Sequence, residues 1–179
     1  LYLDKGFKLI YNDVRKFGFL KLFKNKNIFE CKHLKFLGPE PLTKQFNINY
    51  IIKYFLHKKV SIKDLLMNQK FVAGIGNIYC NEILFLCKIN PRRITKNTNK
   101  KEQKNIIKFT KKILRTSIAQ GGSSIKDFTN TEGVIGNFQQ KFNVYNREKS
   151  KCRSKNCSGI IQKIYISNRS SFFCSKCQK

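Results

Sequence analysis

The sequence predicts an α+β protein with β-structure near its two ends and helices between them. Apolar residues alternate with a period of two near the amino end, and the period changes to about 3.6 between Asn47 and Gln120. Four cysteines then gather near the carboxy end. For 179 residues we expect one domain, or one domain with a small appendage.

Two short strands are predicted at the amino end, at Phe7–Tyr11 and Phe19–Phe23, joined by a turn at residues 12–18. A lone hairpin is marginally stable in water. We therefore expect these strands to be the edge of a larger sheet whose partner strands lie upstream of this chain. The Gly-Pro-Glu-Pro run at residues 38–41 then breaks the chain before the helices.

Four helices are predicted, at residues 51–56, 62–68, 77–87 and 102–120. Ser61, followed three residues later by Asp64, fits the N-cap of the second helix, and Gly121-Gly122 fits the end of the fourth. The fourth helix should turn one apolar face inward, formed by Ile106, Ile107, Ile113, Leu114 and Ile118.

The carboxy-terminal cysteines form two close pairs, Cys152-x4-Cys157 and Cys174-x2-Cys177. This spacing is typical of one tetrahedral, structural Zn²⁺ site on a hairpin, with strands at Ile160–Ile166 and Ser171–Phe173. The alternative is two disulfides. The amino end has no pattern of a secretory signal, so we expect a reducing compartment and favour the metal. Three further cysteines, Cys31, Cys80 and Cys87, fit ordinary buried or half-buried thiols.

The formal charge of +27 predicts a polyanionic partner, with nucleic acid the first candidate. A drift of the genome towards Lys, Asn and Ile codons is the alternative, but drift alone does not deplete Asp and Glu. No apolar run approaches the ~20 residues that cross a bilayer, so we expect a soluble protein that does not enter a membrane.

Gly74 and Gly76 stand directly before the helix predicted to begin at Asn77. Backbone N–H groups at such a helix start can meet an anion, and Asn77 is placed to cap the helix and to donate its amide to a phosphate oxygen. The Rossmann and Walker patterns are both absent. On these residues alone, an ordinary helix–helix turn is an equal alternative.

Residues 70–82, Lys-Phe-Val-Ala-Gly-Ile-Gly-Asn-Ile-Tyr-Cys-Asn-Glu, closely resemble the helix-two-turn-helix element of bacterial formamidopyrimidine-DNA glycosylases. Other segments match the same family in the same order along the chain. They are residues 13–18, 37–42, 89–91, 120–124 and 144–148 and the terminal cysteines. The resemblance covers essentially the whole chain. It implies the end of a β-sandwich catalytic domain at 1–42, a helix-two-turn-helix DNA-binding domain at 43–148 and a zinc finger at 149–179. A loop that covers the lesion would lie at 127–138.

The resemblance implies DNA base-excision repair by a bifunctional glycosylase and AP lyase. Such a parent enzyme removes oxidised purines, 8-oxoguanine and formamidopyrimidines, and nicks the abasic site by β,δ-elimination. Its nucleophile is an amino-terminal proline that attacks C1′ of a flipped-out nucleotide. Leu1 is no secondary amine, and Pro39, Pro41 and Pro91 are internal. We therefore expect a carboxy-terminal fragment, monomeric and in the bacterial cytoplasm, that binds damaged double-stranded DNA and cleaves nothing alone.

Site residues follow from the same resemblance. Arg15 and Phe17, with Lys16 between them, match the residues inserted into the gap left by the flipped base. Asn77 and Arg169 match the pair that grips the phosphates around that nucleotide. Arg169 also stands where the family has an arginine credited with δ-elimination, although a guanidinium rarely gives up its proton, so phosphate clamping is its main expected role.

Three further side chains match with alternatives left open. Lys58 and Lys63 fall where the family has lysines near DNA or the lesion, and a solvated helix face is the other interpretation of both. Glu82 matches a glutamate that reaches towards the active site, and a helix salt bridge is its alternative. The Cys-x4-Cys spacing is looser than the family's usual Cys-x2-Cys but still permits four-coordination.

Other functions compete with this hypothesis. The related endonuclease VIII branch prefers oxidised pyrimidines, but the Arg15-Lys16-Phe17 turn, the long loop and the tetracysteine finger favour the formamidopyrimidine branch. A non-enzymatic, zinc-dependent module for bent or damaged DNA is a second alternative. An RNA- or ribosome-binding zinc protein is a third, which would leave the matches at Arg15, Phe17, Asn77 and Arg169 unexplained.

Overall fold

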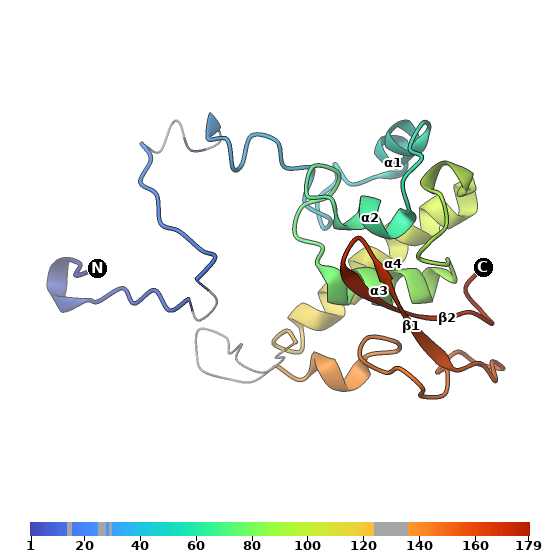
Figure 1. The fold of residues 1–179 in the computed structure, drawn as a ribbon. Helices are drawn as coiled ribbons and strands as arrows, with labels where there is room; N and C mark the ends of the chain where they lie inside the picture. Colours follow the sequence, from blue (N-terminus) through green and yellow to red (C-terminus); the bar gives the residue numbers. More distant parts are fainter. Residues whose placement is uncertain (14–15, 25–27, 29, 124–135) are drawn as a thin grey trace. The chain divides into compact units, whose positions relative to one another are not determined.

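The computed structural model describes residues 1–13, 16–24, 28, 30–123 and 136–179. The chain forms two compact units, Leu1–Lys35 and Phe36–Lys179. The α-helices of the described residues and the carboxy-terminal hairpin belong to the second unit (Figure 1). The α+β class is therefore confirmed, while the predicted domain boundaries at 42/43 and 148/149 stay predictions.

The two strands predicted at the amino end are not formed. In the described part of this unit the strand-like backbone pairing is one bridge, Tyr2 with Lys8, closed by a 3-10 turn at Asp4–Gly6. Side chains along both predicted strands, such as Phe7 and Phe19, are exposed. Strands with no further partner and no apolar face to cover them gain too little to form a ladder.

The described residues of the second unit form four α-helices, α1 (Ile48–Phe55), α2 (Ile62–Met67), α3 (Asn77–Cys87) and α4 (Lys100–Ile118), with 3-10 turns at Thr95–Asn97 and Phe138–Lys141. Ser61 accepts a hydrogen bond from the Asp64 N–H and caps α2 as predicted. Helix α4 begins before the predicted residue, because Asn99 and Glu102 form a reciprocal capping box. At its other end, the Gly122 N–H bonds the Ser117 carbonyl and closes the helix with both glycines at positive φ.

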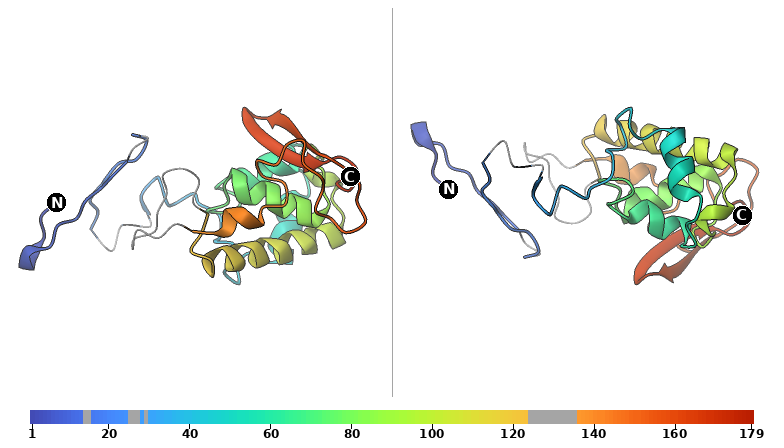
Figure 2. Two further views of the ribbon diagram at one scale, coloured as in Figure 1. Left: turned by 90° about the horizontal axis from the view of Figure 1, so that it is seen from below. Right: turned by 90° about the horizontal axis from the view of Figure 1, so that it is seen from above.

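Helix α3 lies at the centre of the lobe. It packs against α2, α4 and strand β2 (Arg169–Cys174), so apolar residues occur around most of its circumference. Figure 2 shows α3 enclosed between α4 and the hairpin. The helix that carries Asn77 at its start is thus packed against elements on several sides.

The inward face of α4 was predicted only in part. Ile106 and Ile113 are buried, but Ile118 is 67% exposed. The buried positions are 103, 106, 110, 113 and 117, a stripe that includes Gln103, Thr110 and Ser117. Because this stripe advances by three and four residues, it leaves Ile118 on the outer side.

Strands β1 (Ile161–Ile166) and β2 form an antiparallel hairpin with Ile161 opposite Cys174 and Ile166 opposite Arg169. The two-residue turn, Ser167-Asn168, has positive φ at both positions, as a type I′ turn requires. The inner face of the hairpin shares an apolar cluster with α3, formed by Phe85, Val144, Ile161, Phe172 and Cys174. The hairpin therefore does not rely on a core of its own.

Candidate nucleic-acid interface and metal centre

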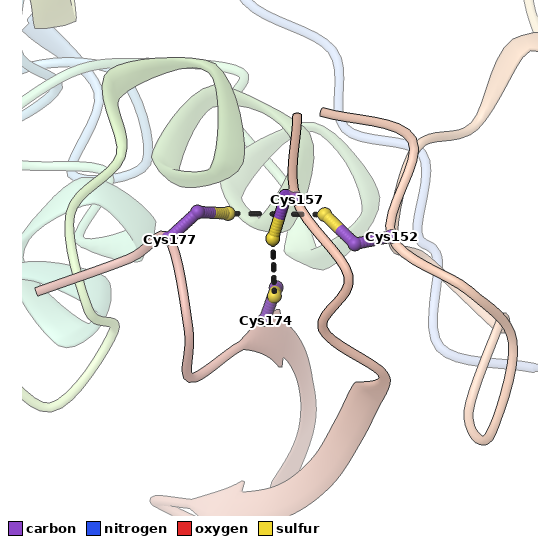
Figure 3. Close-up of side chains that lie close together, drawn as sticks. All are labelled: Cys152, Cys157, Cys174 and Cys177. Atoms are coloured by element: carbon purple, nitrogen blue, oxygen red, sulfur yellow. Dashed lines mark hydrogen bonds between the residues drawn. The ribbon is translucent and has the colours of Figure 1, made fainter. Parts of the chain in front are cut away.

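The four carboxy-terminal cysteines converge at one end of the hairpin (Figure 3). Cys152 and Cys157 precede β1, Cys174 ends β2, and Cys177 follows it. All four Sγ atoms lie within 4.8 Å of one another, and all four are free thiols. The sulfurs of Cys152 and Cys177 are 3.8 Å apart, and those of Cys157 and Cys174 are 3.7 Å apart.

These distances fit four-coordination of a metal ion. A tetrahedron with metal–sulfur bonds of about 2.3 Å has sulfur–sulfur edges of about 3.8 Å. The Ser154 N–H donates to the Cys152 Sγ, and a backbone hydrogen bond from Gly159 lowers the pKa of Cys157. A side chain at Gly159 would place its Cβ 2.5 Å from the Cys174 sulfur. The chain thus folds closely around a cluster of thiols that can hold a metal ion.

The opposite end of the hairpin is joined to the helices by hydrogen bonds that we call the polar seam, which comprises Lys63, Asn77, Asn81 and residues 170–172. The Lys63 ammonium donates to the Ser170 carbonyl at 2.8 Å and to the Ser171 hydroxyl at 2.6 Å. The Asn77 amide donates to the same Ser170 carbonyl at 3.0 Å. Side chains from α2 and α3 therefore meet on one carbonyl of β2.

Asn81 completes the polar seam from the next turn of α3. Its Oδ1 accepts from the Phe172 N–H at 2.7 Å, and its Nδ2 donates to the Asn77 carbonyl at 2.6 Å. Asn81 and Lys63 are each only 1% exposed. Sequence reasoning missed Asn81, although a polar residue four positions after Asn77 in an apolar helix was a usable signal.

The two predicted phosphate-gripping residues are brought together by this arrangement. Arg169 is exposed at the start of β2, and the residue after it is the one that Asn77 contacts. Burial is the main cause that lowers the pKa of Lys63, and the positive charge of Arg169 also lowers it. Cys80 and Asp64 act in the opposite direction, and the resulting pKa is about 8. The helix start and the hairpin tip are therefore neighbours.

The capping role predicted for Asn77 is corrected by the geometry. Gly76 occupies the N-cap, no side chain in the described part of the chain caps this helix start, and the Asn77 amide turns to Ser170 instead. The first backbone N–H groups of a helix have no intrahelical partner. Gln69 braces the loop before them, since its Oε1 accepts from the Gly74 N–H and its Nε2 donates to the Ile75 carbonyl. Gly74 has φ +81, which explains the need for glycine there.

Glu82 is buried and its carboxylate is saturated with donors. Its two oxygens accept from the backbone N–H groups of Asn143, Val144 and Tyr145 and from the Asn143 side-chain amide, at 2.8–2.9 Å. Among the described residues it forms no salt bridge, so the alternative of a helix salt bridge is wrong, and its side chain is only 1% exposed. Its observed contacts join α3 to residues 143–145, which lead towards the cysteine cluster.

The remaining predicted residues are less constrained. Lys58 is exposed, with its Nζ 4.9 Å from the centre of the Tyr54 ring. Lys16 and Phe17 are exposed in the first unit. Arg15 and most of the loop predicted at 127–138 lie outside the described residues.

The basic side chains are almost uncompensated. Between described residues the structure contains one salt bridge, Arg93 with Glu102 at 2.6 Å. None of the helices in the described ranges is long and apolar enough to span a bilayer. The exposed charge is consistent with a polyanionic ligand.

Replacing Glu82 by Gln should lower the free energy of unfolding by about 2–4 kcal/mol, because an amide nitrogen would face N–H donors in a buried site. Urea denaturation of the metal-loaded chain measures this change. Glu40→Gln, at an exposed position, is the matched control and should be neutral. Equal stability of Glu82→Gln and the parent chain would contradict the structural role.

The lowered pKa of Lys63 predicts a pH dependence. Its pKa is about 8 in the fold and near 10.5 when exposed. Between these values the unfolded chain binds more protons, so the lysine's contribution to stability rises as pH increases from 8 to 10.5. The free energy of unfolding of the parent chain minus that of Lys63→Met should therefore increase over this window. A constant or falling difference would contradict the assigned burial.

The chain is similar to known DNA glycosylases along its whole length. Residues 37–129 match the family model for the formamidopyrimidine-DNA glycosylase H2TH domain. The formamidopyrimidine-DNA glycosylase of Hydrogenovibrio crunogenus is 42% identical over 179 residues, and that of Ruegeria sp. is 38% identical over 178. These alignments cover 100% and 99% of this chain but 63% of each relative, so the chain spans less than two thirds of their length.

Solved structures agree in fold. Lactococcus lactis Fpg in complex with DNA containing an abasic site superposes with a TM-score of 0.85 at 33% identity, covering 93% of this chain and 60% of that one. The MutM (Fpg) protein of Thermus thermophilus gives 0.77 at 30% identity, covering 83% and 56%.

Proposed function

Because the chain belongs to the formamidopyrimidine-DNA glycosylase family, we propose that its 179 residues form the DNA-binding part of a base-excision repair enzyme for oxidised purines. The observation that carries this proposal is the convergence of Asn77 and Arg169 through Ser170. The relatives are named as glycosylases, and one solved neighbour is bound to abasic-site DNA. No residue of this chain matches the family's proline nucleophile, so the part assigned here is the grip on DNA.

The grip would act on the sugar-phosphate backbone beside an extruded nucleotide. The Asn77 amide has two N–H groups, and Ser170 accepts only one of them. The second can donate to a phosphate oxygen, together with the uncapped backbone N–H groups at the start of α3. Arg169 adds a charged fork from the hairpin side. If the start of α3 and the hairpin each bound one phosphate, the DNA backbone between them would be kept bent.

Arg15, Lys16 and Phe17 would act on the base that loses its partner when the nucleotide is extruded. Lys16 and Phe17 are exposed, as this role requires. An arginine fork can address the base left without its partner, and a phenyl ring can replace the lost stacking. The exposed Lys58 would add charge to the interface. Lys63 is expected to act through the hairpin instead, because its ammonium is already bonded to Ser170 and Ser171.

We propose Zn²⁺ as the metal of the cysteine cluster. Four thiolates at tetrahedral spacing suit Zn²⁺, which binds such sets without redox chemistry. Its chemistry there is structural: it pins the base of the hairpin whose tip carries Arg169. Cys152, Cys157, Cys174 and Cys177 would hold it.

The phosphate grip is tested by Asn77→Ala and Arg169→Ala. Each should weaken binding to a duplex that contains a tetrahydrofuran abasic site by about 1–3 kcal/mol, through loss of a phosphate contact. Fluorescence anisotropy at a fixed salt concentration measures the change. Asn105→Ala and Lys104→Ala on α4 are matched controls for the lost amide and the lost charge. If both site variants bind as tightly as the parent chain, the proposed grip is wrong.

The metal assignment predicts one zinc ion per chain, measured by native mass spectrometry. Stripping it with a chelator should melt the hairpin and reduce affinity for the abasic duplex, because the thiol cluster loses the bonds that hold it. Cys177→Ser should lower zinc affinity, whereas Cys31→Ser should not. Retention of fold and DNA affinity in excess chelator would contradict a structural zinc site.

A further inference from the structure

The hairpin is held at both ends by different means. Its base carries the thiol cluster, with Cys174 as the last residue of β2. Its tip is held by the polar seam, at residues 170–172. Arg169 lies five residues before Cys174 along β2, a separation of roughly 17 Å. The contacts of the polar seam are therefore much nearer to Arg169 than a metal at the base would be.

We infer that Asn81 is the positioning residue of the phosphate grip. It touches both halves of the grip, through the Phe172 N–H on the hairpin and through Asn77 on α3. This inference rests on the proposed function, because it takes Asn77 and Arg169 to be phosphate ligands. The role that it gives to Asn81 is to hold these two residues in position. Asn81 itself is buried and would not contact DNA.

The direction of its hydrogen bonds gives Asn81 this role. Its Oδ1 is fixed by the Phe172 N–H, so its Nδ2 must point towards Asn77. That Nδ2 lies 2.6 Å from the Asn77 carbonyl and 3.3 Å from the Asn77 Oδ1. A flipped Asn77 amide would set two N–H₂ groups against each other. Asn81 therefore keeps the acceptor of Asn77 inward and its donor towards Ser170 and solvent.

The carbonyl of Ser170 has no capacity left to bind a reoriented side chain. It accepts from both Lys63 and Asn77, which use its two lone pairs. The Ser170 carbonyl, which follows Arg169 in the chain, is therefore bonded to Asn77, and Asn77 is bonded to Asn81. Loss of Asn81 would free the Asn77 amide to rotate and would leave the Phe172 N–H without a partner.

A double-mutant cycle separates positioning from general stability. Binding of the zinc-loaded 179-residue chain to the tetrahydrofuran duplex would be measured for Asn81→Ala, for Asn77→Ala/Arg169→Ala, and for all three changes together. Asn81→Ala alone should weaken binding about tenfold. In the chain that already lacks Asn77 and Arg169, the same change should weaken binding less than about twofold.

Ile83→Val, a buried change on the same helix, is the control for lost stability and should leave affinity unchanged while the fold remains populated. If Asn81→Ala does not fold by circular dichroism, Asn81→Ser replaces it, since its short hydroxyl cannot contact the Asn77 Oδ1. The positioning role would be overturned if the Asn81 change reduced DNA affinity equally in the parent chain and in Asn77→Ala/Arg169→Ala. It would also be overturned if the change reduced affinity in neither. If Asn77→Ala/Arg169→Ala itself bound normally, the proposed grip would fail instead.

Discussion

The hydrogen bonds accepted by the Ser170 carbonyl join the helical lobe to the hairpin at the point where the proposed grip on DNA is assembled. They join the start of α3, the amine of α2 and the beginning of β2 at one point. A buried ammonium costs free energy unless its donors are satisfied, and Lys63 finds its two oxygens only on the hairpin. The hairpin therefore supplies the helical lobe with the hydrogen-bond acceptors of a buried lysine.

Two buried polar side chains on consecutive positions of α3 face different segments. Asn81 holds β2, and Glu82 holds residues 143–145, which lead into the first cysteine pair. With Asn77 one turn earlier, α3 contacts both the tip of the hairpin and the segment that leads to the cysteine cluster. The proposed DNA-binding surface, assembled from distant stretches of sequence, would thereby be positioned by a single helix.

Local signals in the sequence located the four α-helices and the cysteine cluster, although not the inward face of α4 or the orientation of the Asn77 side chain. The Ser61 cap, the bounds of α3 and the four-cysteine cluster were all predicted, because caps and ligand spacing are local patterns. The burial of Lys63 and Glu82 was not predicted, because their hydrogen-bond partners lie 107 and 61 residues away in the sequence. A lysine next to a capped helix start looks solvated until the hairpin is placed on it. The amino-terminal strands failed for a related reason, because a strand depends on partners that local alternation does not supply.

Amide hydrogen exchange of the zinc-loaded chain tests most directly whether helix start and hairpin tip form one rigid body. The Phe172 N–H, bonded to Asn81, should exchange with the same opening free energy as the Leu84 N–H in the centre of α3. That result would mean that the hairpin tip opens only when the lobe itself unfolds. Exchange at Phe172 orders of magnitude faster than at Leu84 would show that the tip moves independently, and would contradict the rigid arrangement.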